Sequence, residues 1–133
     1  MNDVTYELRP IGVVRSELTR REAAPRQGRE GAPHAWIEID PAMVAGLEGI
    51  AMGAEIIVVT WFHLAHRDRL KVHRRGDTRQ PATGVFSTRS PDRPNPLGLH
   101  PVTVLEIAGN RLRVEPMEAI DGTPVVDIKP VIG

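Results

Sequence analysis

The sequence contains no cysteine. A chain without cysteine has no disulfides, no thiolate nucleophile and no zinc or iron–sulfur site ligated by cysteine. Aromatic residues make up only 4% of the chain. This is few for the row of stacked aromatic side chains with which single-strand nucleic-acid modules hold bases. Any covalent or metal chemistry must therefore use other residue types, and a base-stacking module is disfavoured.

Long hydrophobic runs are also missing. The longest apolar run, residues 54–62, is interrupted by Glu55 and is far shorter than the roughly 20 residues that a membrane-spanning helix needs. The N-terminus begins with acidic and polar residues and has no apolar stretch of the secretory type. We therefore expect a cytoplasmic protein that does not contact a membrane.

The chain carries no net charge, because 17 basic residues balance 17 acidic ones. The whole molecule thus has no overall attraction for nucleic acid. Positive charge gathers locally in residues 66–79, where six basic side chains stand against two acidic ones. This basic cluster is the best candidate for contacting phosphate, although a solvated surface loop would show the same pattern. Its basic members are Arg67, Arg69, Lys71, Arg74, Arg75 and Arg79.

The length of 133 residues fits one domain, residues 1–133. Twelve glycines and twelve prolines interrupt nearly every apolar run, which favours short strands over long helices. Asp40 followed by Pro41 predicts one short helix over 42–47, and Gly109-Asn110 predicts a hairpin turn. We predict a mainly β fold, a small barrel or sandwich with long ligand-binding loops. The predicted strands are 6–14, 36–39, 55–63, 70–73, 102–107, 112–115 and 125–128.

Three polar loops are rich in proline and in hydrogen-bonding side chains, namely residues 24–28, 84–98 and 121–130. Proline fixes φ and stiffens a loop, so each could form one wall of a ligand site. The prolines could equally serve only to restrict the unfolded chain. In the last loop Asp127 and Lys129 lie two residues apart on one strand face, where they could also form a plain surface ion pair.

Histidines at 63, 66 and 73 suggest imidazole ligands for a metal. No carboxylate cluster completes such a set, and residues three apart at the end of a strand tend to face opposite ways. We therefore predict no metal site.

Five segments in order together resemble the TsaA-like, TrmO-type family of S-adenosylmethionine-dependent methyltransferases. They are Ile-Gly-Val-Val-Arg-Ser at 11–16, Pro-Arg-Gln at 25–27, Phe-His at 62–63, the loop from Gly84 to Gly98, and Asp-Gly-Thr-Pro-Val-Val-Asp-Ile-Lys-Pro at 121–130. The resemblance implies a small β-barrel that binds the cofactor near a homodimer interface. For characterised members it further implies methylation of N6 of threonylcarbamoyl-adenosine in the tRNA anticodon loop.

The resemblance also implies which residues contact the cofactor. Arg26 and Arg89 suit its carboxylate, Asp121 suits hydroxyl or amine groups, and the backbone around it suits the adenine edge. Asp127 is a candidate for orienting or deprotonating the nucleophile, with Lys129 keeping it ionised, and a structural ion pair is an equal alternative. The implied cofactor contacts are Pro25, Arg26, Gln27, His63, Leu64, Arg89, Leu99, Ile120, Asp121, Gly122 and Thr123.

The chain also departs from the family pattern. Val131 stands where an aromatic residue usually follows Lys-Pro, His100-Pro101 stands where small or apolar residues are expected, and the chain ends three residues after the last motif, where tRNA-acting bacterial members continue into a further domain. Two alternatives therefore stay open: a methyltransferase of a small molecule, and a non-catalytic S-adenosylmethionine-binding module. If tRNA is the substrate, the basic cluster is expected to bind it.

Overall fold

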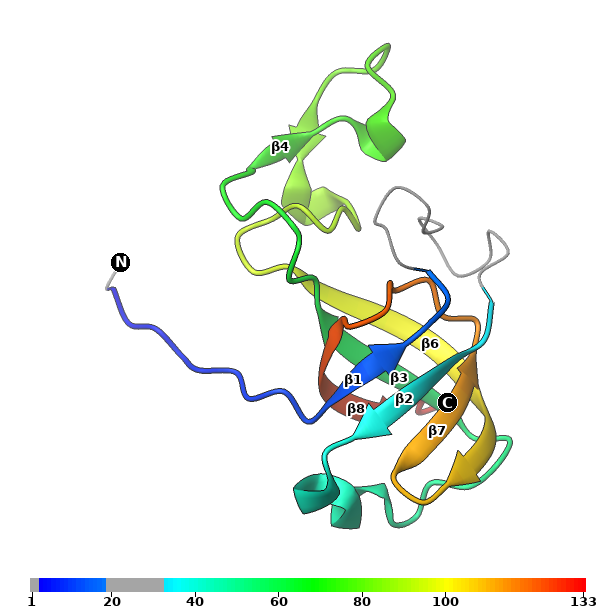
Figure 1. Ribbon diagram of the computed structural model, residues 1–133. Helices are drawn as coiled ribbons and strands as arrows, with labels where there is room; N and C mark the ends of the chain where they lie inside the picture. The colour runs from blue at the N-terminus through cyan, green and yellow to red at the C-terminus, as the bar shows by residue number, and fades with distance from the viewer. Residues whose placement is uncertain (1–2, 19–32) are drawn as a thin grey trace.

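Six antiparallel strands form a closed barrel in the computed structural model, which describes residues 3–18 and 33–133. Around the ring the order is β1, β2, β7, β6, β3, β8, and β8 pairs back to β1 (Figure 1). A separate two-stranded sheet of β4 and β5 stands beside one end of the barrel. The barrel strands are β1 (Gly12–Arg15), β2 (Ala35–Ile39), β3 (Glu55–Trp61), β6 (Leu97–Ala108), β7 (Arg111–Glu115) and β8 (Pro124–Pro130), and the small sheet is β4 (Lys71–Val72) with β5 (Thr83–Gly84).

Alternating apolar residues turn inward from all six barrel strands. In β2, for example, Ala35, Ile37 and Ile39 are buried, while the residues between them are partly exposed. This period-2 pattern is what a strand with one buried face requires. The core consists of Val14, Ala35, Ile37, Ile39, Ile56, Val58, Val102, Val104, Leu112, Val114, Met117, Ala119 and Val125.

A β-bulge in β8 decides which of its side chains face out. Val59 of β3 pairs with Asp127, but the next residue, Thr60, pairs with Val125. The extra residue lets Val125 and Ile128 both turn toward the core. Asp127 and Lys129 then lie together on the outside, where Lys129 Nζ is 3.1 Å from Asp127 Oδ2.

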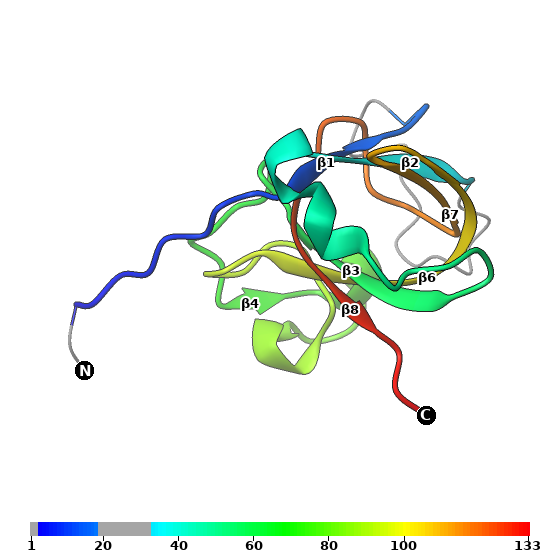
Figure 2. The ribbon, with the colours of Figure 1, turned by 90° about the horizontal axis from the view of Figure 1, so that it is seen from below.

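The predicted short helix is present as a 3-10 helix, η3 (Pro41–Leu47). Asp40 caps it by accepting a hydrogen bond from the Ala42 backbone N–H at 2.9 Å. Met43 and Leu47 pack against the core. Figure 2 shows η3 lying across one end of the barrel, the lower end in Figure 1. Two further single turns are η4 (Arg74–Gly76) and η5 (Val85–Ser87). Within the described residues, no helix has the length and apolar character needed to cross a membrane.

The predicted mainly β barrel with one short helix is confirmed, but several strand boundaries were wrong. Strand 6–14 begins only at Gly12, and the chain before it extends away from the barrel with Tyr6 88% exposed (Figure 1). Its neighbour β8 offers only the pairs Gly12↔Val125 and Val13↔Pro124 before turning to β3. Ile11 still donates its N–H to the Val125 carbonyl at 2.7 Å, but no strand of the described part of the chain pairs with residues 6–10.

The strand predicted at 102–107 starts earlier, at Leu97, and includes Pro101. Proline cannot donate to a ladder and is expected at an edge. At Pro101 the strand has β3 on one side, whereas pairing with β7 begins only at Thr103. The segment predicted at 70–73 is β4 and lies outside the barrel, and the strand predicted at 55–63 ends at Trp61.

Gly12 lies where β1 pairs with β2, and the backbone of β2 leaves no room for a side chain at this position. A Cβ there would overlap the carbonyl oxygen of Glu38 and lie 3.1 Å from Ile39 Cα. Because backbone atoms cannot swing aside, Gly12→Ala should lower the free energy of unfolding in urea by about 1–3 kcal/mol. Gly46→Ala, where the new Cβ meets nothing within 4 Å, is the control and should change stability by less than about 0.5 kcal/mol or raise it slightly. Equal effects of the two variants would contradict this steric account.

Candidate functional site

Three segments rich in polar side chains meet at one end of the barrel. Residues 62–70 leave the end of β3, residues 85–96 lead into β6, and residues 116–123 join β7 to β8, all at the upper end in Figure 1. The Phe62 N–H donates to the Pro96 carbonyl at 2.8 Å, and the Asp121 N–H donates to the Leu18 carbonyl. The first bond joins the segment after β3 to the segment before β6, and the second joins the segment after β7 to the chain that follows β1.

The loop 85–96 is held by Arg93. Its guanidinium donates to the carbonyls of Val85, Thr88 and Ser90 at 2.6, 3.0 and 3.1 Å. Three carbonyls gathered on one cation keep the loop in a single shape. Arg89 in the same loop is exposed and makes no hydrogen bond or ion pair with any residue that the structure describes. The two arginines therefore differ in role: one closes the loop, and the other is available to a ligand.

Arg67 fastens the segment after β3 to this loop. Its Nε donates to the Pro94 carbonyl at 2.7 Å, and its Nη2 donates to Asn95 Oδ1 at 3.2 Å. The guanidinium also lies over the Trp61 ring, 4.9 Å from the ring centroid. Asp92 Oδ1 accepts from the His66 N–H at 2.9 Å. Arg67, predicted as a phosphate contact, thus has a structural use.

The other side chains of the basic cluster lie on residues 68–84, the segment beside the barrel that carries β4, η4 and β5, which we call the outgrowth. Arg79 donates to both carboxylate oxygens of Asp77 at 2.9 and 3.2 Å, which holds the pKa of Asp77 below its usual value and raises the pKa of Arg79. Arg74 donates to the Ser87 carbonyl at 3.0 Å, and Lys71 is exposed. Arg69 lies 3.5 Å from Asp68, and the side chain of Arg75 lies outside the described part.

The segment 120–123 is a turn tied to β1. Asp121 Oδ1 accepts from the Ser16 N–H at 3.1 Å, and the Gly122 N–H donates to the Val14 carbonyl at 2.8 Å. The Thr123 hydroxyl and N–H both bond to the Ile120 carbonyl. Gly122 has φ +87°, a left-handed value that favours glycine. Of the backbone groups predicted to read adenine, those of Ile120, Gly122 and Thr123, the Ile120 carbonyl and the N–H groups of Gly122 and Thr123 are thus already bonded within the protein.

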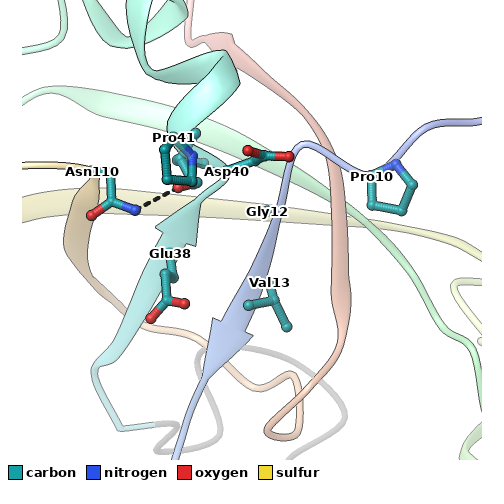
Figure 3. A pocket seen from close by; sticks show the side chains of 8 residues that line it. Pro10, Gly12, Val13, Glu38, Asp40, Pro41 and Asn110 are labelled. Carbon is teal, nitrogen blue, oxygen red and sulfur yellow. Dashed lines mark hydrogen bonds between the residues drawn. The ribbon is translucent and has the colours of Figure 1, made fainter.

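Two shallow hollows flank β1. One, of about 330 Å³, adjoins the candidate site and is lined by Arg15, Ser16, Glu17, His34, Ala35, Trp36 and Asp121. The other, of about 350 Å³, lies at the η3 end, between β1 and β2 (Figure 3). There Asn110 donates to the Ile39 carbonyl at 2.6 Å. None of the predicted site residues lines this second hollow, whereas Asp121 lines the first.

An apolar patch covers the outer wall of β3 and β6. The cross-strand pairs Ile57↔Pro101, Val59↔Leu99 and Trp61↔Leu97 define this outer patch. Leu99, a predicted cofactor contact, is 48% exposed in it. Val59 also pairs with Asp127 on its other side, so Leu99 and Asp127 lie in one row across the wall. His63 and Leu64 come after Phe62, just beyond the end of β3. Both side chains are exposed, Leu64 by 54%.

Sequence reasoning missed three hydrogen-bonded polar side chains, those of Thr60, His100 and Glu118, at the barrel end that carries the candidate site. His100 Nε2 is 2.7 Å from Thr60 Oγ1, and His100 Nδ1 is 2.7 Å from Glu118 Oε1. The only signal in the sequence was a histidine at a position where an apolar residue was expected. The predicted cofactor contacts Pro25, Arg26 and Gln27 lie outside the described residues. Among the residues that the structure describes, no group of three or more His, Asp or Glu could hold a metal ion.

Comparisons with known proteins agree with each other. The family model of the tRNA-methyltransferase O N-terminal domain matches residues 13–133. A protein of Methanothermobacter thermautotrophicus named "Probable S-adenosyl-L-methionine-binding protein" is 45% identical over 130 residues, 98% of this chain and 93% of the relative. One of Archaeoglobus fulgidus, named "S-adenosyl-L-methionine-binding protein", is 47% identical over 122 residues, 92% of this chain and 86% of the relative.

A solved structure has the same fold. The crystal structure of TrmO from Pseudomonas aeruginosa superposes with a TM-score of 0.76 at 32% identity, over 97% of this chain and 57% of that one. This chain therefore spans a little over half the length of that protein.

Proposed function

Because the chain belongs to the tRNA-methyltransferase O N-terminal domain family, we propose that it is an S-adenosylmethionine-dependent methyltransferase. We further propose that its acceptor is N6 of threonylcarbamoyl-adenosine in the tRNA anticodon loop. The main support for this cofactor comes from two relatives whose names state S-adenosylmethionine binding. The similarity to each of them covers over nine-tenths of this chain. The family match and the TrmO structure support the reaction.

The side chains at the candidate site fit this cofactor. S-adenosylmethionine combines an apolar adenine face, ribose hydroxyls, an amine and a carboxylate. Leu64 and Leu99 offer exposed apolar surface, Asp121 offers a carboxylate, and Arg89 offers a guanidinium without a described partner. Each chemical part of the ligand thus has a matching group, and none of these four side chains belongs to the hydrophobic core.

The chain's own residues have three tasks in the reaction. When bound, the cofactor supplies an activated methyl group that a nitrogen can take in line. Arg89 and Asp121 would hold the two ends of the cofactor, because placement of two reactants supplies much of the acceleration in such a displacement. Asp127 would accept the proton that the nitrogen loses, and Lys129, whose Nζ lies 3.1 Å from Asp127 Oδ2, would hold that carboxylate in place. The outer position of Asp127 leaves it accessible to a large substrate.

Two measurements test the proposed function. Calorimetry with S-adenosylmethionine in the presence of a chelator should show binding without metal. Mass spectrometry of tRNA nucleosides, with and without the protein, should show the methylated form of threonylcarbamoyl-adenosine. The relatives' names mention only binding, which favours a binding module as the second candidate. Binding without methylation of tRNA or of small nucleophiles would support that candidate, and no binding at millimolar ligand would refute both.

We also propose that the outer patch is the interface of a homodimer. Leu97 and Leu99 are 41% and 48% exposed on adjacent outward positions, and contiguous exposed apolar surface marks an interaction site. Sedimentation should report twice the chain mass at micromolar concentration. Leu97→Asp should raise the dimer dissociation constant at least tenfold. Ile107→Asp, a comparably exposed position at the far end of β6, should leave it unchanged. A monomer that still binds cofactor would refute the interface.

If tRNA is the substrate, the outgrowth is expected to contact its phosphates. Lys71 and Arg74 are exposed, and neither has an acidic partner in the described residues. Lys71→Glu/Arg74→Glu should weaken tRNA binding about tenfold. It should also make the slope of log affinity against log salt shallower by about one to two, because with fewer phosphate contacts fewer counterions are released on binding. Arg9→Glu/Arg111→Glu carries the same charge change outside the outgrowth, in the N-terminal segment and in β7, and serves as the control. Equal losses in both double variants would indicate only a net-charge effect.

A further inference from the structure

The imidazole of His100 lies buried inside one end of the barrel, between two polar side chains. His100 is 1% exposed, Thr60 is 0% exposed, and the Glu118 side chain is 15% exposed. Both ring nitrogens have a partner at 2.7 Å, Thr60 Oγ1 on one side and Glu118 Oε1 on the other. A buried polar group is costly unless it is hydrogen-bonded, and a fully bonded network rigidifies the parts that it joins. The three side chains therefore depend on one another for partners, and the network can hold their segments in place.

The chemistry of the two partners sets which group donates in each of these hydrogen bonds. An ionised carboxylate only accepts hydrogen bonds, so His100 Nδ1–H donates to Glu118. In the neutral ring, Nε2 then accepts from the Thr60 hydroxyl. The hydroxyl is fully buried and faces no substrate, so this is not a nucleophilic triad of the serine-hydrolase kind. It is a link between three parts of the chain.

Gly98 leaves space for the two neighbours of the His100 ring, Phe62 and Thr60. A Cβ on Gly98 would lie 2.5 Å from the Phe62 ring and 2.6 Å from Thr60 Oγ1. The missing side chain at 98 therefore makes room for both groups beside His100. The Phe62 ring meets the imidazole edge to face, with centroids 5.7 Å apart. Phe62 is also the residue that precedes His63 and Leu64 at the end of β3.

Each end of the link belongs to a segment of the candidate site. Thr60 is in β3, just before 62–64, and Glu118 is two residues before the turn 120–123. We propose that His100 is a positioning residue: through its bond to Glu118 it fixes the loop 116–123 relative to β3, and so sets the spacing between the two halves of the cofactor site. This inference rests on the proposed function only for the identity of the ligand.

Two substitutions of the same residue separate the two bonds. His100→Asn keeps a donor near the place of Nδ1 and so keeps the bond to Glu118. His100→Gln keeps a group near the place of Nε2 and loses that bond. If the Glu118 bond positions the loop, His100→Gln should raise the dissociation constant for S-adenosylmethionine about tenfold, and His100→Asn should change it by less than about threefold. Glu118→Ala should match His100→Gln, and Glu118→Gln, whose amide oxygen still accepts, should restore affinity.

A second readout needs no ligand. Amide hydrogen exchange at residues 119–123 of the unliganded protein should become about tenfold faster in His100→Gln and Glu118→Ala, and stay unchanged in His100→Asn and Glu118→Gln. Thermal unfolding of each variant checks that it is folded. Equal behaviour of the Asn and Gln variants, or unchanged affinity and exchange in all four, would overturn the inference.

Two outcomes separate this inference from others. Loss of affinity in Glu118→Gln with none in His100→Gln would mean that the carboxylate contacts the ligand directly, which also overturns it. If the wild-type protein does not bind S-adenosylmethionine, the proposed function fails, and the exchange rates alone decide whether His100 positions the loop.

Discussion

Asp127→Asn should lower kcat for methyl transfer about 100-fold while leaving the affinity for S-adenosylmethionine within about twofold. A positioned general base typically contributes factors of 10²–10⁴, and an amide cannot accept the proton that the attacking nitrogen loses. The local structure should survive, because the Asn oxygen can still accept from the Ile128 N–H as Asp127 Oδ1 does at 2.8 Å. Rates measured on saturating tRNA at several pH values, together with calorimetry, test both halves.

The matched control for this variant is Glu106→Gln. Glu106 is also an outward carboxylate on a barrel strand, paired with Arg113 at 3.2 Å, but it lies away from the candidate site. Exposed ion pairs of this kind contribute about 0–1 kcal/mol to stability, so neither variant should unfold the protein. If Asp127→Asn keeps its rate within threefold, the pair with Lys129 is a surface ion pair and the base is another group.

The barrel could be predicted because its information is local. Alternation in segments such as 36–39 and 112–115 already shows which side chains turn inward, and the Gly109 turn has the positive φ of +62° that its hairpin needs. The failures depend on distant partners. Residues 6–10 alternate like a strand, but no described strand is left to pair with them. Pro101 is tolerated because β7 begins to pair with β6 only at Thr103. Neither outcome can be predicted from the local sequence, because each depends on which strand lies beside the segment.

The candidate site divides in the same way. The motifs identified loops with the right chemical groups, but they did not distinguish Arg89 from Arg93, which differ only in what surrounds them in space. Arg93 faces three carbonyls of its own loop, a fact of loop closure. The link from Thr60 through His100 to Glu118 joins residues 40 and 18 positions apart. Such a link becomes visible only when β3, β6 and the loop after β7 are assembled.

The difference between the two arginines predicts opposite effects. Arg89→Ala should weaken S-adenosylmethionine binding by about 1.5–3 kcal/mol, the value of a hydrogen bond to a charged group, which is a factor of about 10 to 150 in Kd. It should leave the free energy of unfolding nearly unchanged, because Arg89 makes no polar contact with the described residues. Arg93→Ala should lower stability by removing the donor to three carbonyls.

Calorimetry and urea unfolding on Arg89→Ala, Arg89→Lys and Arg111→Ala complete this test. Lysine keeps the charge but cannot bind a carboxylate with two parallel hydrogen bonds, so Arg89→Lys should fall between wild type and Arg89→Ala. Arg111, stacked on the Trp36 ring at 4.4 Å, controls for the loss of a surface cation and should leave Kd unchanged. An unchanged Kd in Arg89→Ala would remove this residue from the site and leave the cofactor carboxylate to another cation, with Arg26 as the next candidate.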